Sequence, residues 1–257
     1  MNLRFNTSLA DKYKSASQIA RVLTEDWLYR NMYCPICGEV SIQRAEPNAP
    51  VKDCVCERCR SQYELKSKRI VSDKFQGTVP DGVYRTMIGR ITSLDNPSFF
   101  FMHYDRYEVN NLVIVPKCFF TPKIIEKRKP LDVNARRAGW EGCNILMKNI
   151  PSTAKIPVIL NGVPKPKNEV VAQYKKVYNL QTKSVTGRGW LMDMLHLVES
   201  VDDIFTLNQM YSFVNELQQK YPDNHHIQDK IRQQLQFLRD KGIIEFRARG
   251  VYSKIKI

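Results

Sequence analysis

Four of the seven cysteines occur in two close pairs, the first feature of the sequence that could do chemistry. Cys34 and Cys37 form one C-x2-C pair, and Cys56 and Cys59 form a second after a gap of 18 residues. Each pair can place two thiolates on one cation, and four thiolates complete the tetrahedral shell that Zn²⁺ prefers. A closed shell leaves no open position, so the spacing predicts a structural zinc site.

The other cysteines leave alternatives open. Cys54 lies two residues before Cys56 and could compete as a ligand, but Cys56 completes a C-x2-C pair and is preferred. Cys118 and Cys143 have no such partners, and we expect them to be small buried residues. If no metal binds, the four paired cysteines are ordinary thiols.

Two carboxylates and a lysine flank the second cysteine pair. Asp53 precedes it and Glu64-Leu65-Lys66 follows it, giving the pattern D-x10-E-x-K. In a strand, Glu64 and Lys66 project from the same face, and a neighbouring Asp53 would add a second hard oxygen ligand for Mg²⁺. A lysine beside such a metal can orient or deprotonate a water, or stabilise a pentavalent phosphate. Taken alone, however, these common residue types are usually solvated surface charges.

The net charge of +14 favours a polyanionic partner, either nucleic acid or an anionic membrane surface. No apolar run approaches the roughly 18 to 20 residues of a spanning helix, and the N-terminus has no apolar secretion signal, so we expect a cytoplasmic protein with no membrane partner. Residues 183–257 hold 11 basic and 9 acidic residues, whereas residues 1–182 hold 29 and 17. The larger electrostatic footprint therefore belongs to the first 182 residues.

The elements that must position the acidic residues alternate in type along this first part. Apolar periodicity predicts helices over 14–27 and 81–94 and strands over 63–66, 99–104, 111–115, 145–147 and 158–160. This order predicts a mixed α/β domain, a sheet flanked by helices, over residues 1–182. We place a linker at 175–186, which is polar and mostly without periodicity.

The last part of the chain, residues 183–257, has a clearer pattern. Helical spacing predicts helices over 190–200, from 205 onward, and over 224–241. Two short strands follow around the basic turn Arg247-Ala248-Arg249. Three helices followed by a β-hairpin is the order of a winged-helix domain, a variant of the helix-turn-helix.

These features together resemble the PD-(D/E)XK nuclease superfamily and, within it, the DpnI-like methyl-directed restriction endonucleases. The motif reads Pro50-Val51-Lys52-Asp53 and Glu64-Leu65-Lys66, with the proline three residues before the aspartate rather than directly before it. Further similar stretches extend over nearly the whole chain, at 23–27, 64–68, 107–111, 135–140 and 230–235. Between residues 69 and 80 nothing is matched.

The resemblance implies a restriction-endonuclease-like α/β (α+β) nuclease core with an embedded zinc site, followed by a winged helix. It also implies hydrolysis of double-stranded DNA at GATC sites carrying N6-methyladenine, with both domains sensing methylated DNA. Arg136, Arg137 and Trp140 resemble the methyl-sensing loop of the nuclease domain. Arginine can contact phosphate or read guanine, and Trp140 offers a flat apolar surface to the methyl groups. By composition alone, a tryptophan is more often a core residue.

The predicted third helix and the wing add further DNA contacts. Arg232 and Gln233 lie on the polar face of the helix and could bond guanine and adenine, although such a face is usually only solvated surface. Arg247 and Arg249 on the wing would contact phosphate.

We therefore expect a monomeric, Mg²⁺-dependent type II restriction endonuclease acting on adenine-methylated double-stranded DNA. Asp53, Glu64 and Leu65 are assigned to Mg²⁺, and Lys66 assists the nucleophilic water. The alternative is a transcription regulator made of a zinc ribbon and a winged helix, in which the acidic motif is incidental. Cleavage of methylated plasmid with Mg²⁺, but not with EDTA, separates the two.

Overall fold

The computed structural model of the chain describes residues 1–46, 52–93, 96–182 and 184–255. These residues divide into two units, which are described separately. The first comprises residues 1–150 and 154–175, and the second comprises residues 151–153 and 176–257. The predicted boundary at residue 182 stays a prediction.

A seven-stranded sheet forms the centre of the first unit, in the order β1-β2-β3-β5-β6-β9-β10. Its strands are β1 (Gln43–Arg44), β2 (Cys54–Val55), β3 (Gln62–Arg69), β5 (Ser98–Asp105), β6 (Glu108–Val115), β9 (Ile156–Leu160) and β10 (Val163–Pro164). Strands β3 and β5 run parallel, and the other neighbours in this sheet are antiparallel. The middle strands are nearly continuous apolar runs, which suits strands covered on both faces.

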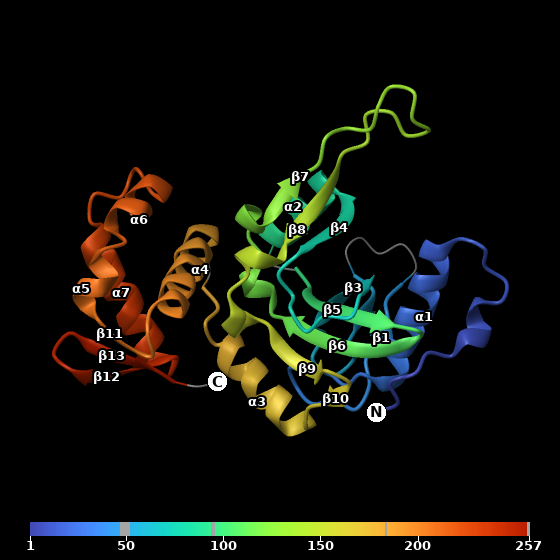
Figure 1. Cartoon of the computed structure of the whole chain (residues 1–257), viewed down its shortest axis with the longest axis horizontal. Helices are drawn as coiled ribbons and strands as arrows, with labels where there is room; N and C mark the ends of the chain where they lie inside the picture. The colour runs from blue at the N-terminus through green and yellow to red at the C-terminus, as the bar shows by residue number, and fades with distance from the viewer. Residues whose placement is uncertain (47–51, 94–95, 183, 256–257) are drawn as a thin grey trace. The chain divides into compact units, whose positions relative to one another are not determined.

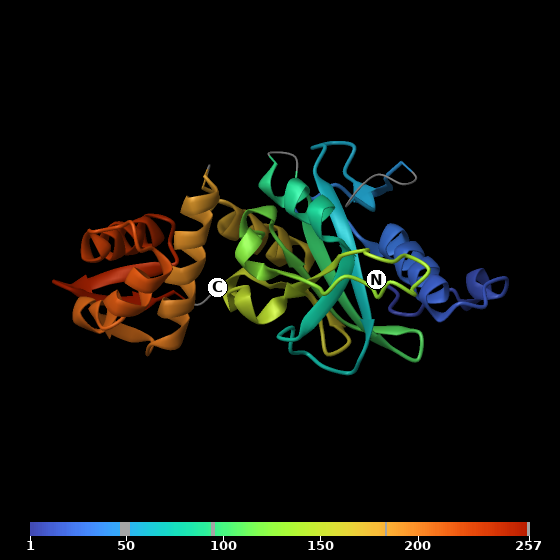
Figure 2. The ribbon, with the colours of Figure 1, turned by 90° about the horizontal axis from the view of Figure 1, so that it is seen from above.

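Helices cover one face of the sheet. Helix α1 (Ala16–Asn31) contacts β3, where Thr24 Oγ1 lies 3.3 Å from Ser67 Oγ. Helix α3 (Lys167–Tyr178) contacts β5, where the Tyr174 and Ser98 hydroxyls are 2.7 Å apart. Figures 1 and 2 show α1 beside the β3 side of the sheet. The mixed α/β character predicted for this part of the chain is confirmed.

A second, three-stranded sheet lies against the other face, in the order β4-β8-β7. It is formed by β4 (Thr78–Val83), β7 (Ile125–Lys127) and β8 (Gly142–Leu146), and α2 (Tyr84–Thr92) follows β4 directly. Short 3-10 turns complete the unit at Thr7–Ala10, Lys117–Phe119, Pro122–Ile124 and Met147–Asn149. A further one, Ser152–Ala154, is shared between the two units. Phe120 stacks on Phe99 with ring centroids 4.0 Å apart, which ties the segment before β7 to the large sheet.

The second unit contains four helices and a small sheet among its described residues. They are α4 (Val185–Ser200), β11 (Ile204–Thr206), α5 (Leu207–Tyr211), α6 (Val214–Lys220), α7 (Ile227–Asp240), β12 (Ile244–Ala248) and β13 (Val251–Lys254). Ile231, Leu235 and Leu238 of α7 are fully buried at helical spacing, so its opposite face is exposed. Strands β12 and β13 form the expected hairpin, and β11 pairs with β13.

Several predicted boundaries were wrong. The helix predicted over 81–94 begins at Tyr84, because 78–83 pairs with β8, a partner some sixty residues away that local periodicity cannot indicate. The linker predicted at 175–186 is shorter, because α3 continues to Tyr178, where Val177 is buried, and α4 begins at Val185 rather than at the predicted residue 190. The helix predicted from 205 begins at Leu207, because Phe205 pairs with Tyr252 and Thr206 caps the helix.

Among the described residues, no helix combines the length and apolar character needed to cross a membrane.

Candidate active site and four-cysteine cluster

The segment from residue 53 to residue 66 folds back on itself and carries both chemical features. Strand β2 pairs antiparallel with β3, with Cys54 opposite Tyr63, and the Asp53 amide donates to the Tyr63 carbonyl at 2.9 Å. Cys56 and Cys59 lie in the turn between the two strands. The carboxylate of Asp53 is thereby carried beside the strand that holds Glu64 and Lys66.

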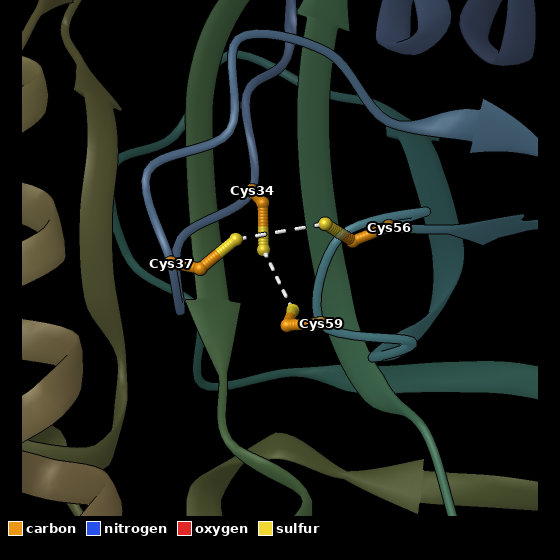
Figure 3. A group of neighbouring side chains, drawn as sticks. All are labelled: Cys34, Cys37, Cys56 and Cys59. Atoms are coloured by element: carbon orange, nitrogen blue, oxygen red, sulfur yellow. Dashed lines mark hydrogen bonds between the residues drawn. The ribbon is translucent and has the colours of Figure 1, made fainter.

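The four predicted cysteine ligands converge on one point. Their sulfur atoms all lie within 4.8 Å of one another, and the Sγ atoms are 3.5 Å apart for Cys34 and Cys59 and 3.6 Å apart for Cys37 and Cys56 (Figure 3). Zinc–sulfur bonds of about 2.3 Å in a tetrahedron require sulfur separations of roughly this size. The cluster could therefore hold a metal ion such as zinc. Cys54 is not part of it.

The backbone around the cluster is shaped for metal binding. The Gly38 amide donates to the Cys34 carbonyl at 2.9 Å, and the Arg60 amide donates to the Cys56 carbonyl at 2.8 Å, so each C-x2-C pair lies in a tight turn. Both turns end in a left-handed residue, with φ of 74° at Gly38 and 58° at Arg60. Burial tends to raise the pKa of Cys59, but its hydrogen bonds with Ser61 and with neighbouring thiols lower it to about 7, toward the thiolate that metals bind.

Three acidic side chains surround the predicted catalytic lysine. The Lys66 Nζ donates to Glu64 Oε1 at 2.8 Å and to Asp81 Oδ1 at 2.6 Å, and all three side chains are at most 14% exposed. Asp53 lies at the next strand edge, where its Oδ2 accepts the Leu65 amide at 2.7 Å. Glu64 Oε2 is buried and has no hydrogen-bond partner among the residues that the structure describes.

Burial sets the charge states of this site. It raises the pKa of Glu64 to about 7. The attraction of Lys66 opposes this rise, whereas repulsion from Asp53 and Asp81 adds to it. Burial also raises the pKa of Asp53, although the Leu65 amide opposes it. For Lys66, burial lowers the pKa, but Glu64 and Asp81 outweigh it and the net pKa is raised. Lys66 is therefore an ammonium ion, and the carboxylates are poorly neutralised.

This donor set fits a hard divalent cation. Two desolvated carboxylates, one with an unpaired oxygen, are the oxygen ligands that Mg²⁺ takes. Pro50 and Val51 of the sequence motif lie outside the described residues.

The three residues expected to sense the methyl group lie together on the segment 128–141, which projects between β7 and β8 (Figure 1). Arg136 and Arg137 are exposed and Trp140 is half-buried. The Leu131 amide donates to the Trp140 carbonyl at 3.0 Å, so the base of the segment continues the β7–β8 hairpin. A Cβ at Gly142 would meet the Trp140 ring at 2.6 Å, so a larger residue there would displace the ring.

The DNA-binding residues expected in the second unit are all exposed. Arg232 and Gln233 stand on the outer face of α7, and Arg249 stands at the turn of the hairpin. Arg232 donates to the Tyr211 hydroxyl, and Arg247 is paired with Glu245 of its own strand. Arg232 and Arg247 therefore each contact a neighbouring side chain on the surface.

Sequence reasoning missed two residues of the site. Asp81 was assigned to the start of a helix, and only the bend implied by Pro80-Asp81-Gly82 could have signalled a strand irregularity. Tyr63 was assigned to a strand without a role, yet its hydroxyl lies 3.0 Å from Cys34 Sγ, which links the cysteine cluster to the strand of Glu64.

A basic α/β unit with a desolvated acidic site, joined to a unit of helices and a β-hairpin, is the architecture expected of a nucleic-acid-binding protein with a candidate hydrolytic centre. Residues 1–183 match the family model DpnI, the Dam-replacing family, and residues 186–254 match DpnI_C, the Dam-replacing HTH domain. The chain belongs to the DpnI, Dam-replacing family and ends in a helix-turn-helix domain. Family membership points to a restriction endonuclease whose action depends on Dam methylation.

Proposed function

We propose that this protein is a Mg²⁺-dependent, methyl-directed type II restriction endonuclease that hydrolyses double-stranded DNA at GATC sites carrying N6-methyladenine. We also propose that it acts as a cytoplasmic monomer. The observation that carries the proposal is the largely buried group of Asp53, Glu64 and Lys66, which the pairing of β2 with β3 brings together, in a family member with a helix-turn-helix domain.

In this proposal residues 1–182 form a PD-(D/E)XK nuclease domain. Asp53 and Glu64 hold Mg²⁺ through their carboxylates, together with the Leu65 carbonyl. The Leu65 amide already bonds Asp53, and the two backbone polar groups of a strand residue point to the same edge. When bound, Mg²⁺ would lower the pKa of a water and neutralise charge on the scissile phosphate.

Lys66 supplies a fixed positive charge in this scheme. Because its pKa is raised, it donates hydrogen bonds rather than accepting a proton. An ammonium held in a buried site orients the attacking water and stabilises the extra negative charge of a pentavalent phosphate. The raised pKa of Lys66 supports orienting the water over deprotonating it, the two roles that the residue types left open.

Zinc in this proposal has a structural role. Four thiolates fill its shell, and the turn that holds Cys56 and Cys59 joins Asp53 to Glu64. The ion would thereby fix the connection that brings the two carboxylates to the same place.

Recognition is assigned to both domains. Trp140 packs on the adenine methyl groups while Arg136 and Arg137 contact phosphate or guanine. Residues 183–257 act as a winged helix, with Arg232 and Gln233 of α7 in the major groove and Arg247 and Arg249 of the hairpin on phosphate.

The test uses one plasmid prepared with and without adenine methylation, incubated with the full chain in Mg²⁺ or in EDTA. We expect cutting of the methylated plasmid in Mg²⁺ alone, at positions that map to GATC. A transcription regulator would shift the plasmid on a gel but leave it intact. Cutting of both plasmids at the same rate would remove the methyl-directed part of the proposal.

A further inference from the structure

The carboxylate of Asp81 is aimed at the acidic site by an irregularity in its strand. Strand β4 pairs with β8 in register up to Asp81 and Cys143, and the register then shifts so that Val83 faces Gly142 and Gly82 is extra. A bulge of this kind redirects a side chain, and bulges are frequent beside active sites. The Gly82 amide donates to Asp81 Oδ1 at 2.7 Å, which fixes the carboxylate in that direction.

Burying the Asp81 carboxylate at this position is energetically unfavourable. Its side chain is 11% exposed, and its Oδ2 atom has no hydrogen-bond partner among the described residues. Lys66 already has Glu64 at 2.8 Å, so a second carboxylate leaves the trio with an excess negative charge in a buried place. Neutralising Lys66 therefore does not require Asp81.

The second carboxylate has a use if Glu64 binds another group and cannot hold Lys66 by itself. In the proposed nuclease Glu64 holds Mg²⁺, and its oxygens cannot then serve as the only anchor of Lys66. Asp81 comes from a different sheet, and its Oδ1 holds the Lys66 ammonium at 2.6 Å independently of Glu64. We propose that Asp81 is a positioning residue, which keeps the Lys66 ammonium directed at the scissile phosphate while Glu64 is engaged with the metal. This inference rests on the proposed function.

The principal variant is Asp81→Asn, which keeps the shape and an oxygen for Gly82 but removes the charge. We expect the single-turnover rate for cleaving methylated duplex in Mg²⁺ to fall about 100-fold, typical of losing a group that acts in the transition state. Affinity for the same duplex in EDTA should stay within about 3-fold, because Asp81 does not contact DNA. The matched control is Asp105→Asn, which removes a carboxylate paired with Arg69 at the far end of β5 and should cut at the wild-type rate.

A double-mutant cycle separates positioning from general damage to the fold. If Asp81 acts through Lys66, then Asp81→Asn added to Lys66→Met should slow cleavage by less than about 3-fold beyond Lys66→Met alone. Independent effects that multiply would overturn the proposal. Asp81→Glu, which restores the charge at a slightly wrong place, should recover part of the rate.

A further measurement needs no cleavage. NMR of the lysine side-chain ammonium groups in Mg²⁺ without DNA, where Glu64 is engaged with the metal, should show a slowly exchanging signal, assigned to Lys66 by its absence in Lys66→Met and lost or broadened in Asp81→Asn. If Asp81→Asn keeps the wild-type Lys66 signal, or cleaves methylated duplex at the wild-type rate, the role of Asp81 is overturned but the proposed function is not. A wild-type chain that never cuts methylated DNA would instead overturn the proposed function, and this inference with it.

Discussion

The four-cysteine cluster and the acidic site share one short segment, yet they differ in how complete they are. The cysteines face one another, so that one soft cation would satisfy all four sulfur atoms. In the acidic site, carboxylates crowd a single ammonium, and Glu64 Oε2 and Asp81 Oδ2 have no hydrogen-bond partner among the described residues. The cluster is closed, whereas the acidic site has an electrostatic need that a bound cation could meet. One short segment therefore carries both a cluster suited to a structural metal ion and an acidic site suited to catalysis.

The strongest test of this difference removes one oxygen ligand and leaves the sulfur cluster untouched. Asp53→Asn keeps an oxygen for the Leu65 amide but lowers the charge available to Mg²⁺. We expect single-turnover cleavage to fall by about 10³-fold or more, as for an essential catalytic group. Zinc content, measured by atomic absorption, should not change. Metal-dependent cutting at the wild-type rate would show that the oxygen site lies elsewhere.

The reverse substitution should damage both sites, because the cluster lies in the turn between the two carboxylates. In Cys59→Ser, loss of zinc should loosen the segment from Asp53 to Glu64, since structural zinc contributes on the order of 10 kcal/mol to the folding of small zinc domains. We expect loss of cleavage and new proteolytic cuts in this segment, while the helix-turn-helix domain still binds DNA.

The matched control for this substitution is Cys118→Ala, which removes a buried thiol outside the cluster and should keep both zinc and cleavage. If cleavage survives removal of zinc by a chelator, the two sites are independent and zinc does not hold Asp53 and Glu64 in place.

How much of the two sites could be predicted follows from how far apart their residues lie in the chain. The four cysteines and the D-x10-E-x-K pattern fall within about thirty residues, where spacing alone carries the geometry. Asp81 was not predictable, because β4 pairs with a strand some sixty residues later, and the apolar spacing of Met87 and Ile91 in α2 was extended backward over it. Burial of Val177 likewise kept α3 helical where its polar surface resembled a linker.

The pH dependence of cleavage should report the oxygen site alone. Burial raises the pKa of Glu64 from 4.5 to about 7, and the carboxylate must be ionised to hold a cation. Cleavage at low Mg²⁺ should therefore fall about 10-fold per pH unit below pH 7. Higher Mg²⁺ should move the midpoint to lower pH, because metal competes with the proton.

The same shift affects stability in the absence of metal, with a defined sign. The folded protein holds the Glu64 proton more tightly than the unfolded chain, so the free energy of unfolding should decrease as pH rises from 4.5 to about 7. Glu64→Gln should remove that decrease in denaturant titrations done in EDTA. A pH profile that is flat across this window in both experiments would mean that Glu64 is ionised throughout.

The smallest expected effect concerns a residue outside both sites. Trp140 lies at the base of the projecting segment 128–141, half-buried with its ring over Gly142. If it packs on two methyl groups, each worth about 0.8 kcal/mol of apolar burial, Trp140→Ala should reduce the preference for methylated over unmethylated duplex by about 10-fold. The absolute rate on saturating methylated duplex should change little, because the acidic site is intact. The control is Tyr107→Ala, which removes an exposed aromatic side chain of the same unit.

The alternative role for Trp140 is to support the β7–β8 hairpin, and this role predicts different measurements. A supporting residue would lower the melting temperature and slow the cleavage of both duplexes by the same factor, which leaves the preference unchanged. Because β8 pairs with the strand of Asp81, such support would also reach Lys66. A ratio of methylated to unmethylated cleavage that moves while the melting temperature stays constant therefore assigns Trp140 to recognition, and separates the reading of DNA from the site that cuts it.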